Sequence, residues 1–314
     1  MSPASRTGDV WPKGARAAIA LTLDNMGEAA DIERDLWPSD KPIGSHFSVV
    51  EVIPKILTLL ERYNVNVTYF VEAWNLSVYA DTISAIARAG HEIAWHGWQH
   101  ESWARLDAQA EEENFDRSFG EGGLEGLLRK IEHHPSGGKK VTGGLYRGFR
   151  PPGGVIDEAR TLKLCGERGL SYISPAAQEA ALVKTGHDED KIAVLPFRWT
   201  TVDATYYMDA FGKLRPLKGF PSKDPVPPAE LAQKYIEQID ETIETGGFLS
   251  LLFHPFLTTS SDRMAAMETV TKYLAEKRDE GAIWLAKCQD IATYLHEHPG
   301  TVGEYPTWDR TTWR

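Results

Sequence analysis

Cysteine is scarce in this sequence. Cys165 and Cys288 are the only two, and neither lies in a Cys-x-x-Cys pair. Two such residues cannot build the disulfide framework of a small secreted domain. No apolar run approaches the ~20 residues of a membrane span, and residues 1–10 lack the apolar core of a secretory signal. We therefore predict a cytoplasmic protein with no membrane partner.

Positive charge is also in short supply. Lysine and arginine number 34 against 45 aspartates and glutamates, which gives a formal net charge of −11. Affinity for nucleic acids comes largely from basic side chains, so this balance argues against a nucleic-acid partner. The hydrophobic fraction of 42% is ordinary for a globular protein and supports a sizeable core.

Short apolar runs alternate with longer amphipathic stretches along the chain. This alternation predicts an α/β fold with a parallel sheet, either open or closed as a barrel. No linker divides the sequence, so we predict one catalytic domain over residues 1–314, with an N-terminal extension 1–15 and a C-terminal tail 298–314. The predicted strands are Ala17–Leu23, Val65–Val71, Glu92–His96, Tyr172–Ser174, Ile192–Leu195, Phe248–Phe253 and Ala282–Leu285. The predicted helices are Val49–Tyr63, Tyr79–Ala89, Ala108–Ile131, Glu158–Arg168, Pro228–Thr245, Arg263–Arg278 and Lys287–Glu297.

Three polar residues near strand ends suggest a metal site. His96 and His100 are four residues apart and follow a predicted strand, and Asp24 follows another. Two imidazoles and one carboxylate form a common set of ligands for a catalytic divalent metal. The alternative is a pair of buried structural histidines and a turn aspartate. Glu28, four residues after Asp24, is a further candidate for the catalytic base.

Other polar residues also follow strand-like segments. Arg150 stands before a Pro-Pro-Gly-Gly exit and could orient a carboxylate through a paired hydrogen bond. His254 ends an apolar strand and could protonate a leaving amine, although a core histidine is the alternative. Asp203 is a candidate substrate contact or a partner of Arg150. Because parallel strands place their carboxyl ends at one edge, these residues should share a site with Asp24 and His96.

The ordered motifs resemble the polysaccharide deacetylase superfamily, which includes NodB-like deacetylases. The similarity covers roughly residues 15–295, and its details are closest to the peptidoglycan-deacetylase-like and PuuE-type allantoinase branch. The motifs that carry it are Thr22-Leu23-Asp24-Asn25, His96 to His100, Arg150-Pro151-Pro152-Gly153 and Leu252-Phe253-His254. The resemblance implies a distorted (β/α) barrel of about seven parallel strands, a divalent metal, most often zinc, and hydrolysis of an amide by metal-activated water.

The sequence departs from the family at its first motif, because Asn25 stands where a second aspartate is usual. One carboxylate must then serve where the family has two. We predict that Asp24, His96 and His100 bind the metal, and that Glu28 or Glu72 supplies the base. Arg150 and His254 would complete the catalytic set. The predicted substrate contacts are Glu72, Trp74, Trp98, Pro151, Trp199 and Asp203.

Two kinds of substrate fit this chemistry, an N-acetylated sugar or related small amide, and a cyclic amide or imide. A catalytically silent binding protein on the same scaffold is a further alternative, raised by Asn25. The segments Gly27–Phe47 and Phe197–Pro227 are longer than ordinary loops, and long loops often carry function. We expect them to cover the barrel mouth or pack against a second subunit, and we predict a homo-oligomer that acts on a small soluble amide.

Overall fold

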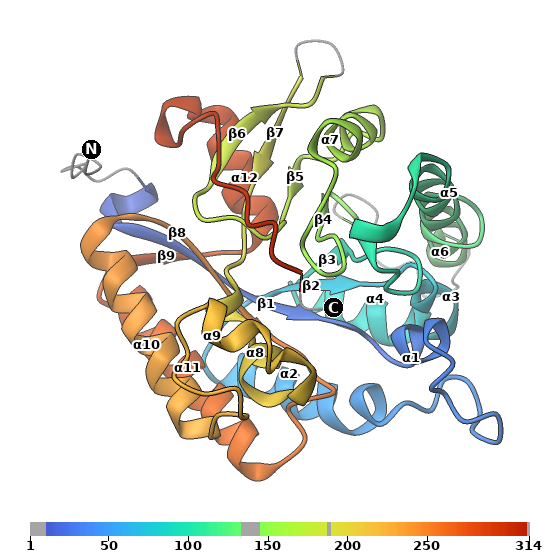
Figure 1. The fold of residues 1–314 in the computed structure, drawn as a ribbon, viewed down its shortest axis with the longest axis horizontal. Coiled ribbons are helices and arrows are strands. Elements are labelled where there is room, and N and C mark those ends of the chain that lie inside the picture. Colours follow the sequence, from blue (N-terminus) through green and yellow to red (C-terminus); the bar gives the residue numbers. More distant parts are fainter. Residues whose placement is uncertain (1–10, 133–144, 187–189, 313–314) are drawn as a thin grey trace.

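The computed structural model describes residues 11–132, 145–186 and 190–312. Its centre is a curled sheet of nine strands, with helices packed around it (Figure 1). The strand order is β6-β7-β5-β4-β3-β2-β1-β8, and β9 pairs with β1. The strands are β1 (Ala17–Asp24), β2 (Thr68–Val71), β3 (Glu92–Trp95), β4 (Gly148–Phe149), β5 (Tyr172–Ile173), β6 (Ala181–Lys184), β7 (Lys191–Val194), β8 (Gly247–Phe253) and β9 (Ile283–Leu285).

The helices occupy most of the predicted amphipathic stretches. None of those described is long and apolar enough to cross a membrane. The α-helices are α1 (Ala29–Glu33), α2 (Ile53–Arg62), α3 (Asn75–Val78), α4 (Ala80–Arg88), α5 (Ala108–Phe119), α6 (Leu124–Glu132), α7 (Glu158–Glu167), α8 (Asp203–Tyr207), α9 (Leu214–Leu217), α10 (Pro228–Thr245), α11 (Ser261–Asp279) and α12 (Cys288–Glu297).

The central strand β1 explains how the sheet is covered on both faces. Ala17, Ile19, Leu21 and Leu23 belong to the core beneath the outer helices. The alternate residues Ala18 and Ala20 face a second core, which includes Ile291 and Leu295 of α12. This second face becomes polar toward the strand's end, where it continues with Thr22 and Asp24. Because strand side chains alternate between two faces, the face of β1 that packs against the second core ends in polar residues at the carboxyl edge.

The predicted fold class is confirmed, with differences in detail. Every strand pair is parallel except β6 with β7, and β6 and the two-residue β4 were not predicted. The predicted helix 108–131 is wrong as one element, because a turn at Gly120–Gly123, a glycine-rich break that itself indicates a loop, separates α5 from α6. The short helices α1, α8 and α9 lie in the two long segments predicted as loops, and α3 lies where no helix was predicted. Gly137–Gly144, a glycine-rich stretch whose composition also indicates a loop, lies outside the described residues.

Both ends of the described chain pack against the rest of the fold. Trp11 is buried against the rings of Trp284 and Tyr294. The tail runs back to the loop after β5, where the Asp309 amide donates to the Ala176 carbonyl. In the tail, Asp309 Oδ2 also lies 2.5 Å from Lys218 Nζ. The division into an extension, a catalytic domain and a tail stays a prediction.

Candidate active site

Polar side chains gather at the carboxyl ends of five neighbouring strands. Asp24 is the last residue of β1, and Glu72, His96, Arg150 and His254 directly follow β2, β3, β4 and β8. These strands are adjacent in the sheet, so the topology brings residues from distant parts of the chain to one edge. This is the edge at which parallel α/β folds bind their ligands.

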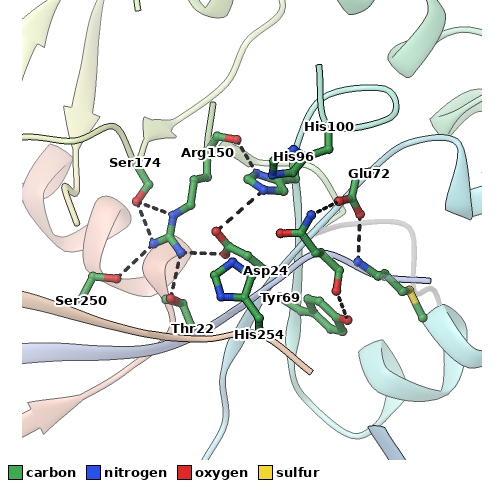
Figure 2. A network of polar contacts seen from close by, with 12 residues as sticks. Thr22, Asp24, Tyr69, Glu72, His96, His100, Arg150, Ser174, Ser250 and His254 are labelled. Carbon is green, nitrogen blue, oxygen red and sulfur yellow. Dashed lines mark hydrogen bonds and ion pairs between the residues drawn. The ribbon is translucent and has the colours of Figure 1, made fainter. Parts of the chain in front are cut away.

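Arg150 is almost fully enclosed, with 1% of its surface exposed. Its Nη1 donates to Asp24 Oδ1 at 2.7 Å and to the Thr22 hydroxyl at 2.9 Å. Its Nε and Nη2 donate to the Ser174 hydroxyl, and Nη2 also donates to the Ser250 hydroxyl (Figure 2). All five guanidinium hydrogens thus have acceptors, which fixes the side chain and places its positive charge beside the Asp24 carboxylate.

His96 lies beside the same carboxylate. Its Nδ1 donates to the Arg150 carbonyl at 2.7 Å, which leaves Nε2 to face Asp24 Oδ2 at 3.8 Å. The ring of His100 packs edge-on against that of His96, with centroids 4.9 Å apart. Burial lowers the pKa of His96 to about 4, and burial and the neighbouring His96 lower the pKa of His100 well below its ordinary range. Both imidazoles are therefore neutral at physiological pH.

His254 is paired with a buried aspartate. Its Nδ1 lies 2.5 Å from Asp203 Oδ1, and its backbone N–H donates to Asp203 Oδ2 at 2.8 Å. Burial lowers the pKa of His254, but the charge and hydrogen bond of Asp203, together with the charge of Asp24, raise it, and the net shift is upward. Asp203 therefore supports a protonated His254 whose Nε2 is turned away from the aspartate. The Arg150 side chain donates to Thr22, Asp24, Ser174 and Ser250, and the predicted contact with Asp203 is not among these hydrogen bonds.

Asn25 is tied to Glu72 rather than to a metal. Its Nδ2 donates to Glu72 Oε1 at 3.0 Å, and the Glu72 carboxyl also accepts from the Met26 amide and from Asn75 Nδ2. An aspartate at position 25 would instead set two carboxylates about 3 Å apart, which costs free energy in a buried site. Asn25 also adopts a φ of +60°, in the left-handed region that asparagine tolerates better than most residues.

Some of the predicted site residues do not line the pocket. Glu28 is fully buried, where Oε1 accepts from the Gly44 amide and Oε2 from the Tyr79 hydroxyl, each at 2.5 Å. It anchors the 27–47 segment and does not line the pocket. Glu72 faces Asn25, although burial raises its pKa to about 8. Trp74 and Trp98 join the loops after β2 and β3 through a backbone hydrogen bond and are likewise absent from the pocket lining.

The pocket is lined by both polar and apolar side chains. Its polar lining comprises Asp24, Asn25, Arg34, His96, His100, Arg150 and His254. Its apolar lining includes the predicted Pro151 and Trp199, together with Phe197, Val202, Met208, Phe211, Leu252 and Phe256. Both long segments contribute to it. Arg34 was not predicted, because a lone arginine after a five-residue helix carries no pattern in the sequence.

The arrangement of these donors does not fit a divalent metal. Among the described residues, no three histidine, cysteine, aspartate or glutamate side chains are placed to hold one ion. His96 is oriented for a metal through Nε2, but His100 Nδ1 accepts from Arg34 Nη2 at 2.8 Å. Asn25 removes the second carboxylate. The zinc site predicted on Asp24, His96 and His100 stays a prediction.

The fold and the site together define a class of protein. Ionisable side chains gathered at the carboxyl edge of a curled, mostly parallel sheet are typical of hydrolases with a barrel-type fold. Residues 14–173 match the polysaccharide deacetylase family, and the chain belongs to this family. It is therefore a hydrolase of the class that acts on carbon–nitrogen bonds other than peptide bonds. The matched region holds Asp24, His96, His100 and Arg150, while Asp203 and His254 lie beyond it.

Individual relatives are distant in sequence, and two solved structures are alike in fold. A peptidoglycan deacetylase of Helicobacter pylori is 21% identical over 267 residues, which cover 79% of this chain and 85% of that protein. A solved Mycobacterium smegmatis protein described as a polysaccharide deacetylase is 23% identical, with a TM-score of 0.71 and 96% of each chain covered. The PuuE allantoinase structure is 20% identical, with a TM-score of 0.66 over 92% of this chain and 93% of that one. These likenesses support the barrel fold.

Proposed function

We propose that the protein hydrolyses a small amide, with Asp24 as the base and His254 as the acid. One observation carries this proposal: two ionisable groups of the same pocket each have a separate, buried partner. Arg150 holds Asp24, and Asp203 holds His254. Arg150 Nη1 donates to Asp24 Oδ1 and fixes that carboxylate, and Asp203 raises the pKa of His254, so each group has a separate partner suited to one role in acid–base catalysis.

The reaction follows from this assignment. Asp24 takes a proton from water as the water oxygen bonds to the amide carbon. His254 Nε2 then donates its proton to the leaving nitrogen as the carbon–nitrogen bond breaks. Arg150 contacts neither substrate nor water in this scheme; it is a positioning residue whose hydrogen bonds fix Asp24 Oδ1. The base is therefore Asp24, in place of the predicted Glu28 or Glu72, which face other partners.

The substrate that we propose is a compact amide or cyclic imide with an apolar face. Phe197, Trp199, Met208 and Phe211 come from one long segment and line the pocket together with the polar residues. Flat apolar walls favour a ring with few hydroxyl groups, because each buried hydroxyl needs a hydrogen-bond partner. The second candidate is an acetylated sugar, which the deacetylase family favours.

A hydrolysis screen separates these candidates. We expect small N-acyl amides, hydantoins or imides to show a kcat/KM at least roughly tenfold above that of N-acetylglucosamine oligomers, since one or two poorly matched polar groups cost about 1–3 kcal/mol. Product analysis by mass spectrometry would identify the broken bond. Rates that rise with the number of sugar units would contradict the proposal and support a polysaccharide deacetylase.

The acid role of His254 predicts a shifted pH profile in Asp203→Asn. Besides Asp203, Asp24 raises the pKa of His254 and Arg150 lowers it. Removing Asp203 removes the main upward influence, so the His254 pKa should fall. Because a general acid works in its protonated form, kcat/KM should then decline at a lower pH than in the wild type. A measured profile with an unchanged alkaline limb would rule out this role.

Two further predictions concern the surroundings of the enzyme. The exposed apolar side chains Leu36, Ile43, Phe47 and Val50 lie in and just after the 27–47 segment, and Leu217 lies in the other long segment. Their exposure on these segments supports the predicted homo-oligomer, since exposed apolar surface often marks an interface. The cytoplasmic location also stays a prediction.

A further inference from the structure

Arg34 occupies an unusual place for a cation. It follows α1 and lines the pocket together with His96 and His100. Its Nη2 lies 2.8 Å from His100 Nδ1. The segment that carries it is secured by Glu28, which accepts from the Gly44 amide and the Tyr79 hydroxyl. A guanidinium therefore stands directly against one of the two histidines that the HxxxH motif offers to a metal.

This contact decides which nitrogen of His100 has a lone pair to give. Arginine has only donors, so the Nδ1 that meets it must be the acceptor of the imidazole. A neutral imidazole then carries its hydrogen on Nε2 and has no second lone pair. Neither nitrogen of His100 is available to a metal ion while Arg34 holds this position. Ligation through Nε2 would require a hydrogen on Nδ1, which would face the Arg34 donor.

The charges around the pocket also oppose the binding of a metal ion. Asp24 is the sole carboxylate among the lining residues, and it is already paired with Arg150. Asn25 is neutral, and Arg34 adds a positive charge. Divalent ions are bound by anionic or neutral donors, so a guanidinium beside them opposes binding by repulsion as well as by occupying the lone pair.

We propose that Arg34 and a divalent metal exclude one another at His100, so that Arg34 sets the metal affinity of this pocket. With Arg34 in place, the positive charge beside the two histidines is supplied by the protein itself. A metal enters the site of Asp24, His96 and His100 only when the guanidinium moves away. This inference concerns the pocket of the proposed function, but it depends on metal binding alone and not on any particular substrate.

Zinc titration of the purified, chelator-treated full-length protein tests the proposal. The variants are Arg34→Ala and, as a matched control that also removes one positive charge, Arg62→Ala, whose side chain pairs with Glu268 on the surface. We expect Arg34→Ala to bind one Zn²⁺ roughly 10- to 100-fold more tightly than the wild type, the range found when groups that contact metal ligands are changed. Arg62→Ala should bind as the wild type does.

Two further variants locate the effect. Arg34→Lys keeps a cation in the segment and should retain weak binding, whereas Arg34→Ala/His96→Ala should lose the affinity gained. Circular dichroism would confirm that each variant is folded. Equal zinc affinity in the wild type and Arg34→Ala, or tight binding by the wild type, would overturn the proposal. Because the readout is binding, a failure to find hydrolysis would count against the proposed function and leave this result unaffected.

Discussion

Asp24→Asn is expected to lower kcat by roughly 10²- to 10⁴-fold, the usual effect of losing an acid–base group. Asparagine has the shape of aspartate and can still accept the Arg150 hydrogen bond that now spans 2.7 Å. It cannot take a proton from water. The loss should therefore fall on kcat, with KM changed little, because the proposed role begins only when the water attacks.

The measurement is steady-state kinetics on the best substrate of the hydrolysis screen. Asp262→Asn is a suitable control, because it makes the same chemical change on the exposed start of α11, away from the pocket. A thermal melt would show whether the Asp24 variant keeps its fold. Asp24→Asn activity within twofold of the wild type would exclude Asp24 as the base. An inactive wild type would instead support the silent binding protein.

Much of the fold can be predicted from the sequence, because the residue patterns of most strands are simple. The residues of β1 are apolar on one face and turn from alanine to threonine and aspartate on the other, so both the strand and its polar end can be predicted. β4 has only two residues and β6 pairs with a hairpin neighbour at the sheet edge. Such elements depend on contacts made elsewhere in the sheet, and local patterns do not reveal them.

The site was harder to predict than the fold, because side-chain roles depend on partners distant in the sequence. The spacing of Glu28 from Asp24 suggested a second pocket carboxylate, but Tyr79 and Gly44 bind it elsewhere. Asp203 was a candidate partner of Arg150, yet the start of α8 directs it to His254. In each case the residue type was informative, and only the packing decided which neighbour it serves.

The stability of the protein also depends on partners distant in the sequence, as Arg150 shows. Arg150→Met is expected to lower the free energy of unfolding by about 3–5 kcal/mol, the usual cost of removing one partner from a buried ion pair. Methionine can fill part of the space over the Phe70 ring, where the guanidinium now lies 4.0 Å from the centroid. It cannot compensate the charge of Asp24 or donate to the Ser174 and Ser250 hydroxyls.

Urea denaturation of Arg150→Met should be compared with Arg62→Met, which removes a pair whose arginine is 58% exposed and should cost at most about 1 kcal/mol. The double variant Arg150→Met/Asp24→Asn identifies the cause. If the loss comes mainly from an uncompensated Asp24 charge, neutralising that charge should recover a substantial part of the stability, and the two changes will not be additive. Strict additivity, or a loss below about 1 kcal/mol in Arg150→Met, would show that Arg150 does not secure Asp24 energetically.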